Sequence, residues 1–367
     1  MRSARRSDGS AGNSVEAAAA TARAIRVRGV TPGWAVAAVA FLAVALVVGV
    51  VAGPVHIGVG DVLRSLGEKL GIPGVTSPLD ATQESIVWDL RVPRVLLAGL
   101  VGGMLAIAGA TYQGVFHNPL ADPYLLGVAA GAGLGATLSI AYLPDALAGR
   151  HVLPVAAFAG ASIAVVLAYA IGRAAGRERD AATLVLAGVT VASFFTALQT
   201  FVQQQNADTL QEVTSWILGS LPNTGWSDVV ALTPYVLVAT AVIVAMRRVV
   251  DVLSLGDLEA ASLGVDVRRT RLTLVVAATV GTAAAVAVCG LIAFVGIIVP
   301  HAIRLVAGTS YRGLLPLSFV VGAGFLILAD VVARTALAPA EVPIGVITAL
   351  FGAPFFAFVL RTRGGRA

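Results

Sequence analysis

Residues 254–264 read SLGDLEAASLG and lie between two long apolar runs. The stretch is too short and too polar to cross a bilayer, and Gly256 and Gly264 suit reversals of the chain near its two ends. Arginines crowd both flanks: Arg247, Arg248, Arg268, Arg269 and Arg271. Such an excess of arginine is typical of a cytoplasmic loop. The pattern predicts a compact knob, a helix of about one to two turns, on the cytoplasmic face of a membrane bundle.

The composition is that of a membrane protein. The chain has 367 residues, of which 57% are hydrophobic and 12% charged, and a soluble protein of this length could not bury so much apolar surface. A helix needs roughly 20 apolar residues to span a bilayer, and about ten runs approach that length. These runs are 34–52, 93–113, 124–142, 152–171, 182–205, 228–246, 272–289, 292–306, 313–333 and 342–360. We therefore expect an all-α polytopic membrane protein with about ten transmembrane helices.

The charges predict how the chain is oriented. The net charge of +5 sits in loops between the apolar runs, where it serves topology rather than nucleic-acid binding. Residues 1–33 are predicted to be a flexible basic cytoplasmic tail, and residues 34–367 a single transmembrane domain. An even number of spans with both termini cytoplasmic satisfies the positive-inside rule, and the loop at 206–227, which has no lysine or arginine, then falls outside. The expected location is the cell (inner) membrane.

The longest outer loop is predicted at 54–92. Within it, Val62, Leu63, Leu66 and Leu70 recur at helical spacing. This spacing predicts an amphipathic helix at the outer surface of the membrane.

The sequence gives little evidence for an ATP-binding site or a metal site. The only lysine, Lys69, follows Glu68, so the chain lacks the Gly-Lys-Ser/Thr of a phosphate-binding loop, and any ATP would have to bind another polypeptide. His117 with Asp122 is poor evidence for a metal site. We interpret both, with Asn118, as turn and helix-end residues, Asp122 being placed to cap a helix after Pro123.

Other motifs in the spans have structural interpretations. Pro300 and His301 are expected to break a short helix rather than to bind iron, and Cys289 is expected to be a small core residue. The string GAGLGA at 131–136 lies within a span and indicates close helix packing, not a dinucleotide loop. We predict no metal and no cofactor bound by this chain, and no enzyme activity.

A polar stripe marks the run at 182–205. Uncharged polar groups inside a membrane must find partners or water. In a two-fold dimer such a stripe could face its copy and line a wet path, or it could bond to neighbouring helices. The stripe consists of Ser193, Thr196, Gln199, Thr200, Gln203 and Asn206, which share one face at 3.6 residues per turn.

Several motifs, in order, resemble the FecCD family of permease subunits, which serve binding-protein-dependent ABC importers of vitamin B12, ferric siderophores and haem. They cover the chain from about residue 55 to its end. The motifs are RVPR (91–94), GATYQGVFHNPLADPYLLGVAAGAGLGA (109–136), SLGDLEAASLGV (254–265), GLIAFVGIIVPHAIRL (290–305) and LADVVARTALAPAEVPIGVITALFGAPFF (328–356).

The resemblance implies the type II ABC importer permease fold, a homodimer with ten helices per subunit, two ATP-binding subunits below it that hold ATP and Mg, and an extracytoplasmic substrate-binding protein above it. It implies a coupling helix at about 254–264, where Gly256, Asp257, Glu259 and Gly264 would meet the ATPase. It also implies that the binding protein docks on Arg91, Arg94 and Arg334. Alternatives for these arginines are contact with lipid headgroups and, for Arg334, an intrahelical pair with Asp330. The fifth span would line the translocation pathway.

The cargo is the least determined feature of the sequence. An iron chelate (ferric siderophore or haem) is expected, with cobalamin or another corrinoid as the alternative. A function of another class, an ion-coupled secondary transporter, would place ionisable residues near the middle of the membrane. The spans are almost free of such residues, which favours the importer subunit.

Overall fold

The computed structural model describes residues 32–143, 152–174, 181–221 and 225–364. Every named element in these ranges is a helix. Residues 1–31, which make up nearly all of the predicted cytoplasmic tail, lie outside the described residues. The first helix begins at Pro32, two residues before the predicted start of the first span.

Seven helices within the described ranges are long and apolar enough to cross a membrane, and three shorter apolar helices bring the total to ten. The seven are α2 (Pro32–Val51), α5 (Val92–Val115), α7 (Val152–Ala174), α8 (Ala181–Gln205), α10 (Trp226–Ala245), α13 (Val267–Cys289) and α15 (Tyr311–Thr335). The other three are α6 (Val128–Tyr142), α14 (Val295–Ala307) and α16 (Ile344–Gly364), whose apolar part is the shorter segment Ile344–Ala357. The prediction of an all-α polytopic protein is confirmed.

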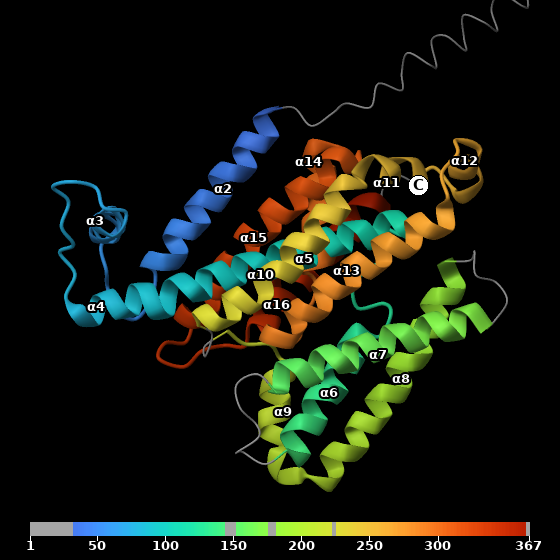
Figure 1. Ribbon diagram of the computed structural model, residues 1–367, viewed down its shortest axis with the longest axis horizontal. Coiled ribbons are helices and arrows are strands. Elements are labelled where there is room, and N and C mark those ends of the chain that lie inside the picture. Colours follow the sequence, from blue (N-terminus) through green and yellow to red (C-terminus); the bar gives the residue numbers. More distant parts are fainter. Residues whose placement is uncertain (1–31, 144–151, 175–180, 222–224, 365–367) are drawn as a thin grey trace, which may run out of the picture.

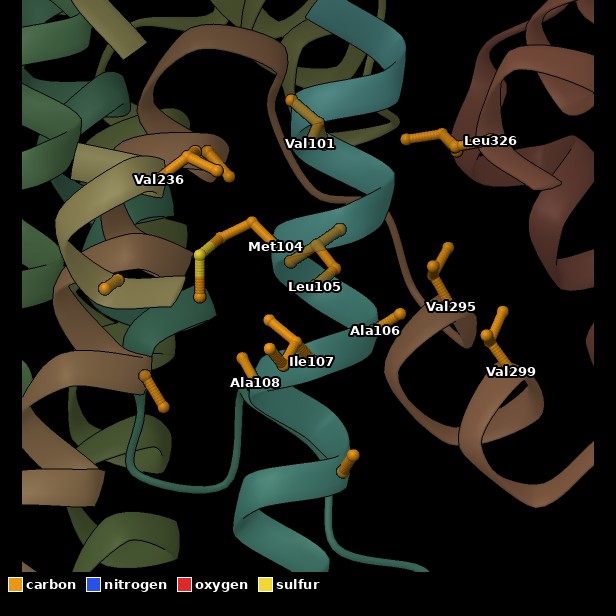
Figure 2. Packing of buried hydrophobic residues seen from close by; sticks show 14 of the residues in the cluster. Val101, Met104, Leu105, Ala106, Ile107, Ala108, Val236, Val295, Val299 and Leu326 are labelled. Carbon is orange, nitrogen blue, oxygen red and sulfur yellow. The ribbon is translucent and has the colours of Figure 1, made fainter. Parts of the chain in front are cut away.

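The helices form two groups (Figure 1). One group contains α6, α7 and α8, with the short helix α9 (Leu210–Ile217) at one end. The other surrounds α5, the most deeply buried span, which packs on α10, α13, α14 and α15. Figure 2 shows how Met104 of α5 reaches toward Val236 of α10, while Ala106 faces Val295 and Val299 of α14.

Small residues set the closest helix contacts, as the sequence predicted. A Cβ atom at Gly131 or Gly135 of α6 would collide with backbone carbonyl groups of Gly160 or Ala156 on α7. In lipid there is no hydrophobic driving force for helix association, so the helices associate through close backbone packing of this kind. The interpretation of GAGLGA as a packing motif is confirmed.

Helix α14 packs on α5 through a carbonyl group that Pro300 sets free. A proline cannot donate to the carbonyl four residues earlier, which is that of Gly296. Gln113 of α5 donates to this oxygen from Nε2 at 3.1 Å, and Gly109, one turn earlier on α5, has no Cβ to obstruct the approach. The donor from α5 takes the place of the missing amide, and the helix continues through Pro300 to Ala307. The prediction that Pro300 breaks this helix was wrong.

The predicted outer loop at 54–92 contains more helix than expected. The amphipathic helix is present as α3 (Val59–Lys69). After it, α4 (Ala81–Ser85) and the π-helical segment η1 (Ile86–Arg91) continue directly into α5. Asp80 caps α4 by accepting from the amide of Gln83 at 2.7 Å, so the helix starts well outside the apolar run.

Candidate functional site

The knob predicted at 254–264 is present. Helix α12 (Asp257–Ser262) lies between Gly256 and Gly264, whose φ angles of 130° and 82° are in the region that favours glycine. It is preceded by α11 (Arg247–Leu253) and followed by α13, and Figure 1 shows it projecting at one end of the bundle. The local prediction of a short helix between two chain reversals is confirmed.

The predicted coupling residues differ in what they present to a partner. Asp257 accepts two hydrogen bonds from Nη2 of Arg271, at 2.7 and 2.9 Å, which ties α12 to the start of α13. The carboxylate of Glu259 folds back over Gly256 at the helix start. The most exposed apolar groups are Leu255, Leu258 and Leu263, with 65%, 84% and 65% of their surface accessible. The knob therefore offers leucines as well as acidic groups, a feature that sequence reasoning missed.

The knob is anchored from behind by α11. Nε2 of His117, after the end of α5, lies 2.5 Å from the carbonyl oxygen of Leu253. Asp251 accepts from the amide of Tyr311 at 2.5 Å and from the hydroxyl of Ser310 at 3.0 Å, at the start of α15. These contacts connect the segment that precedes α12 to the end of α5 and to the start of α15.

The six residues of the polar stripe do not share one environment. Ser193, Thr196 and Thr200 are exposed and line a common groove along α8. Gln199 is buried and lies against Gly133 of α6, so it belongs to helix packing within the chain. Successive residues of a helix are rotated by about 100°, so Gln199 lies at the edge of the stripe relative to Thr200. Helix α6 covers that edge.

The remaining two stripe residues lie near the end of α8. Gln203 is half-buried. Asn206 follows the helix, where its Nδ2 donates to the carbonyl of Val202 at 3.0 Å. The structure therefore brings three of the six predicted pathway residues together.

Asp122 completes the groove along α8. This residue lies in the segment between α5 and α6, and it lines the groove with Tyr124, Ser193, Thr196 and Thr200. Its Oδ1 accepts from the amide of Tyr124 at 2.8 Å, which forms a local turn. Helix α6 begins only at Val128, so the prediction that Asp122 caps that helix was wrong.

The groove is rigid at Asp122 because the segment is fixed at two further points. The hydroxyl of Tyr124 donates to the carbonyl of Ile292 at 3.0 Å and accepts from the Ile292 amide at 3.2 Å. The carbonyl of Leu125 packs directly on Gly188 of α8. Burial raises the pKa of Asp122 to about 6, while the hydrogen bond from the Tyr124 amide lowers it. The carboxylate thus stands on the predicted pathway face, although the sequence indicated only a turn.

The three arginines predicted to dock a partner make contacts within the chain. Arg91 is buried and donates to the carbonyls of Val50 and Val51, at the end of α2, and to that of Val55 beyond the helix. Arg94 donates to Asp330 and, through both Nη atoms, to the carboxylate of Glu341 at 2.9 Å.

Arg334 is also buried. It donates to the carbonyl of Gly49 and lies 3.4 Å from Asp330, four residues earlier on the same helix, so the alternative of an intrahelical pair is confirmed. Together with Arg91 it satisfies carbonyls at the end of α2 that lack helical partners. The docking role of the three arginines stays a prediction.

Metal-binding groups do not gather in the part of the chain that the structure describes. No cluster of three or more His, Cys, Asp or Glu side chains occurs there. His301 is buried against the rings of Phe355 and Phe356, the first in an edge-on contact at 5.9 Å. Cys289 is buried and donates to the carbonyl of Ala285.

A bundle of apolar spans, a projecting knob and a polar groove along one span define a multi-pass membrane permease. The chain belongs to the FecCD transport family, whose model matches residues 41–362. It is 39% identical over 332 residues to an uncharacterised ABC transporter permease, YvrB, of Bacillus subtilis, covering 89% of this chain and 93% of the relative. It is 41% identical over 286 residues to the cobalamin import permease BtuC of Halobacterium salinarum, covering 78% and 76%.

The fold agrees with this assignment. A solved structure of an ABC transporter assigned to the metal-chelate type, in an inward-facing conformation, superposes with a TM-score of 0.78 at 27% identity. The match covers 90% of this chain and all of that one. The Fe(3+) dicitrate permease FecC of Escherichia coli is 34% identical over 293 residues, covering 80% of this chain and 87% of the relative. The chain is thus a permease subunit of an ABC importer.

Proposed function

We propose that two copies of this chain form the membrane channel of a binding-protein-dependent importer that carries an iron chelate, a ferric siderophore or haem, into the cell. ATP hydrolysis on two separate subunits drives the transport, and these subunits contact and move α12. Both termini face the cytoplasm, on the same side as the knob, in agreement with the arginines around 247–271.

This proposal rests on how the knob is held and on what it exposes. It is braced from behind by Asp251 and His117 and tied to α13 by the Asp257–Arg271 pair, yet it leaves Leu258 almost fully accessible. Exposed apolar groups beside a polar rim mark protein–protein contacts. A braced, protruding helix transmits displacement, as a subunit driven by an external ATPase requires.

Cargo would pass along the groove formed by Ser193, Thr196 and Thr200 of α8. Its hydroxyls offer weak, exchangeable contacts, which suit passage better than tight retention. A loaded binding protein would dock at the outer end, near Arg91, Arg94 and Arg334. For Arg94 this docking requires that a carboxylate of the partner replace that of Glu341, whereas Arg91 and Arg334 would have to leave their carbonyl partners.

Cobalamin or another corrinoid is the second candidate cargo. It is supported by the 41% identity to the archaeal cobalamin permease. The iron-chelate cargo is supported by the likeness to the dicitrate permease and to the metal-chelate transporter.

The test is reconstitution of the purified chain into liposomes, alone and with its ATP-binding subunits and binding protein. Uptake of radiolabelled ferric chelate and of cobalamin is then measured against a gradient. Uptake should require all the components and ATP. Accumulation by the isolated chain, driven by a proton or sodium gradient, would instead identify an ion-coupled secondary transporter.

A further inference from the structure

Helix α3 turns its apolar face away from the rest of the chain. Val59, Leu63, Leu66 and Leu70 have 45%, 57%, 38% and 70% of their surface accessible. At about 100° per residue, these four side chains fall within one narrow sector of the helix. Ser65, which is buried, lies on another side of α3 and faces the bundle. An exposed apolar stripe of this kind marks a contact with something outside the chain.

The depth of α3 follows from its contact with Trp88. Helix α2 has 20 residues, which at 1.5 Å per residue give about 30 Å, the thickness of the hydrocarbon core. Arg91 donates to the carbonyls of Val50 and Val51 at the end of α2, and so marks the edge of that core. Trp88 lies about one turn farther out on the same continuous helix, and its Nε1 donates to Oγ of Ser65 at 2.9 Å. Helix α3 therefore lies at the level where the membrane meets water.

The surroundings of α3 agree with this level. Trp226, the first residue of α10, donates from Nε1 to the carbonyl of Trp88 at 2.8 Å, and Nζ of Lys69 lies 5.2 Å from the centre of the Trp88 ring. Tryptophans gather at the membrane–water interface, where a lysine can hold its charge among the headgroups. Helix α3 contacts α2, a span that exposes Val44 and Val47, and Figure 1 shows both at the edge of the bundle. The apolar face of α3 thus continues a surface that lipid covers.

The polar side of α3 points away from the membrane. Oε2 of Glu68 accepts from the amide of Ser77 at 2.7 Å. Ser77 precedes Asp80, which caps α4 at the end of the long α4–η1–α5 helix that is farthest from the membrane. Glu68 is two residues from both Leu66 and Leu70, and a rotation of about 200° places it nearly opposite them. The leucines therefore face the membrane.

We propose that α3 is an interfacial anchor, whose apolar face inserts among the phospholipids of one leaflet between their headgroups and acyl chains. The proposed orientation of the chain makes this the outer leaflet, whereas the insertion itself depends on neither that orientation nor the cargo. A helix that lies in the interface binds through the apolar area that it buries. Because Ser65 accepts from Trp88, the anchor also holds η1 at a fixed level.

The test uses single thiols in the purified full-length chain, in a Cys289→Ala background. Leu63→Cys and Leu66→Cys place a bimane label on the apolar face. Arg64→Cys is the matched control, since Arg64 is also exposed but is rotated by about 100° from Leu63, toward the polar side. Each labelled chain is reconstituted into vesicles of phosphatidylethanolamine and phosphatidylglycerol. Fluorescence quenching is measured with a phospholipid that carries a nitroxide near the top of its acyl chain, and separately with iodide on both sides of the membrane.

The lipid nitroxide should quench the labels at positions 63 and 66 severalfold more than the label at position 64, and iodide should give the reverse order. Iodide quenching at 63 and 66 as strong as at 64 would place the face in water and overturn the proposal. Labels at 63 and 66 that neither quencher reaches would show that a second copy of the chain covers the face, which would also overturn it. The measurement needs no transport, so a wrong assignment of the importer function would leave it unchanged.

Discussion

The contact between Gln113 and the carbonyl that Pro300 sets free gives a sharp test of the fold. Gln113 is buried; its Nε2 donates to Gly296 and its Oε1 accepts from Nη1 of Arg304 at 2.5 Å. Gln113→Met keeps the length of the side chain but removes both of these bonds, together with the longer bond of 3.4 Å from Nε2 to the carbonyl of Ala121. A buried carbonyl left without a donor costs about 1–3 kcal/mol. Loss of the bond from Arg304 adds about 1 kcal/mol, less than the full value because Arg304 is half-exposed and retains Tyr311.

Gln113→Met should therefore destabilise the chain by about 3 kcal/mol. The second substitution, Pro300→Ala, supplies the missing amide, which lies at the correct position in α14 to donate to Gly296. The double variant should recover about 1–2 kcal/mol of the loss. Pro354→Ala in α16 (a proline also inside a helix) is the matched control and should recover nothing in the Gln113→Met background.

The measurement is the unfolding free energy in mixed detergent–SDS micelles for the wild type, both single variants and the double variant. A double-mutant cycle then isolates the coupling between the two positions. If Pro300→Ala fails to restore stability, or if Pro354→Ala restores as much, Gln113 does not replace the missing amide and the explanation of the unbroken helix is wrong.

Three further predictions concern charged side chains. Arg94→Gln should lower the free energy of unfolding by about 3 kcal/mol, because it leaves the buried Asp330 with Arg334 alone. Glu341→Gln, at the exposed end of the same network, should lower it by less than about 1 kcal/mol. Equal losses of stability in the same unfolding assay would contradict the burial argument. Burial raises the pKa of Asp122 from 3.8 to about 6. Between these pH values the native state keeps a proton on Asp122 that the unfolded state has released. The stability of the wild type should therefore fall as the pH rises from about 4 to about 6. The melting temperature of Asp122→Asn relative to the wild type should therefore rise over that range, and a constant difference would refute the shift. Glu259→Arg, on the exposed face of α12, should leave the melting temperature and binding-protein docking unchanged but uncouple uptake from ATPase stimulation in the reconstituted complex; normal uptake would count against the coupling role.

Local features of the fold follow directly from the sequence. Apolar runs of bilayer length predicted the spans, and the glycine-bounded stretch at 254–264 predicted α12. The spacing of Leu63, Leu66 and Leu70 predicted α3, and the four-residue separation of Asp330 and Arg334 allowed their pair. Each depends on neighbours a few residues apart, and helical periodicity fixes their geometry before any tertiary contact forms.

The tertiary structure decided which partner each polar side chain meets. Arg91 is used by the end of α2, Arg94 joins residues more than 230 positions away, and Gln199 is covered by α6. Pro300 would end an isolated helix, but a donor from α5 replaces the amide that proline lacks. Helical periodicity predicts which side chains share a face, but it does not predict which element covers that face. A buried polar group takes whichever donor or acceptor the packing brings within reach, and for this chain the packing placed Asp122 on the groove along α8.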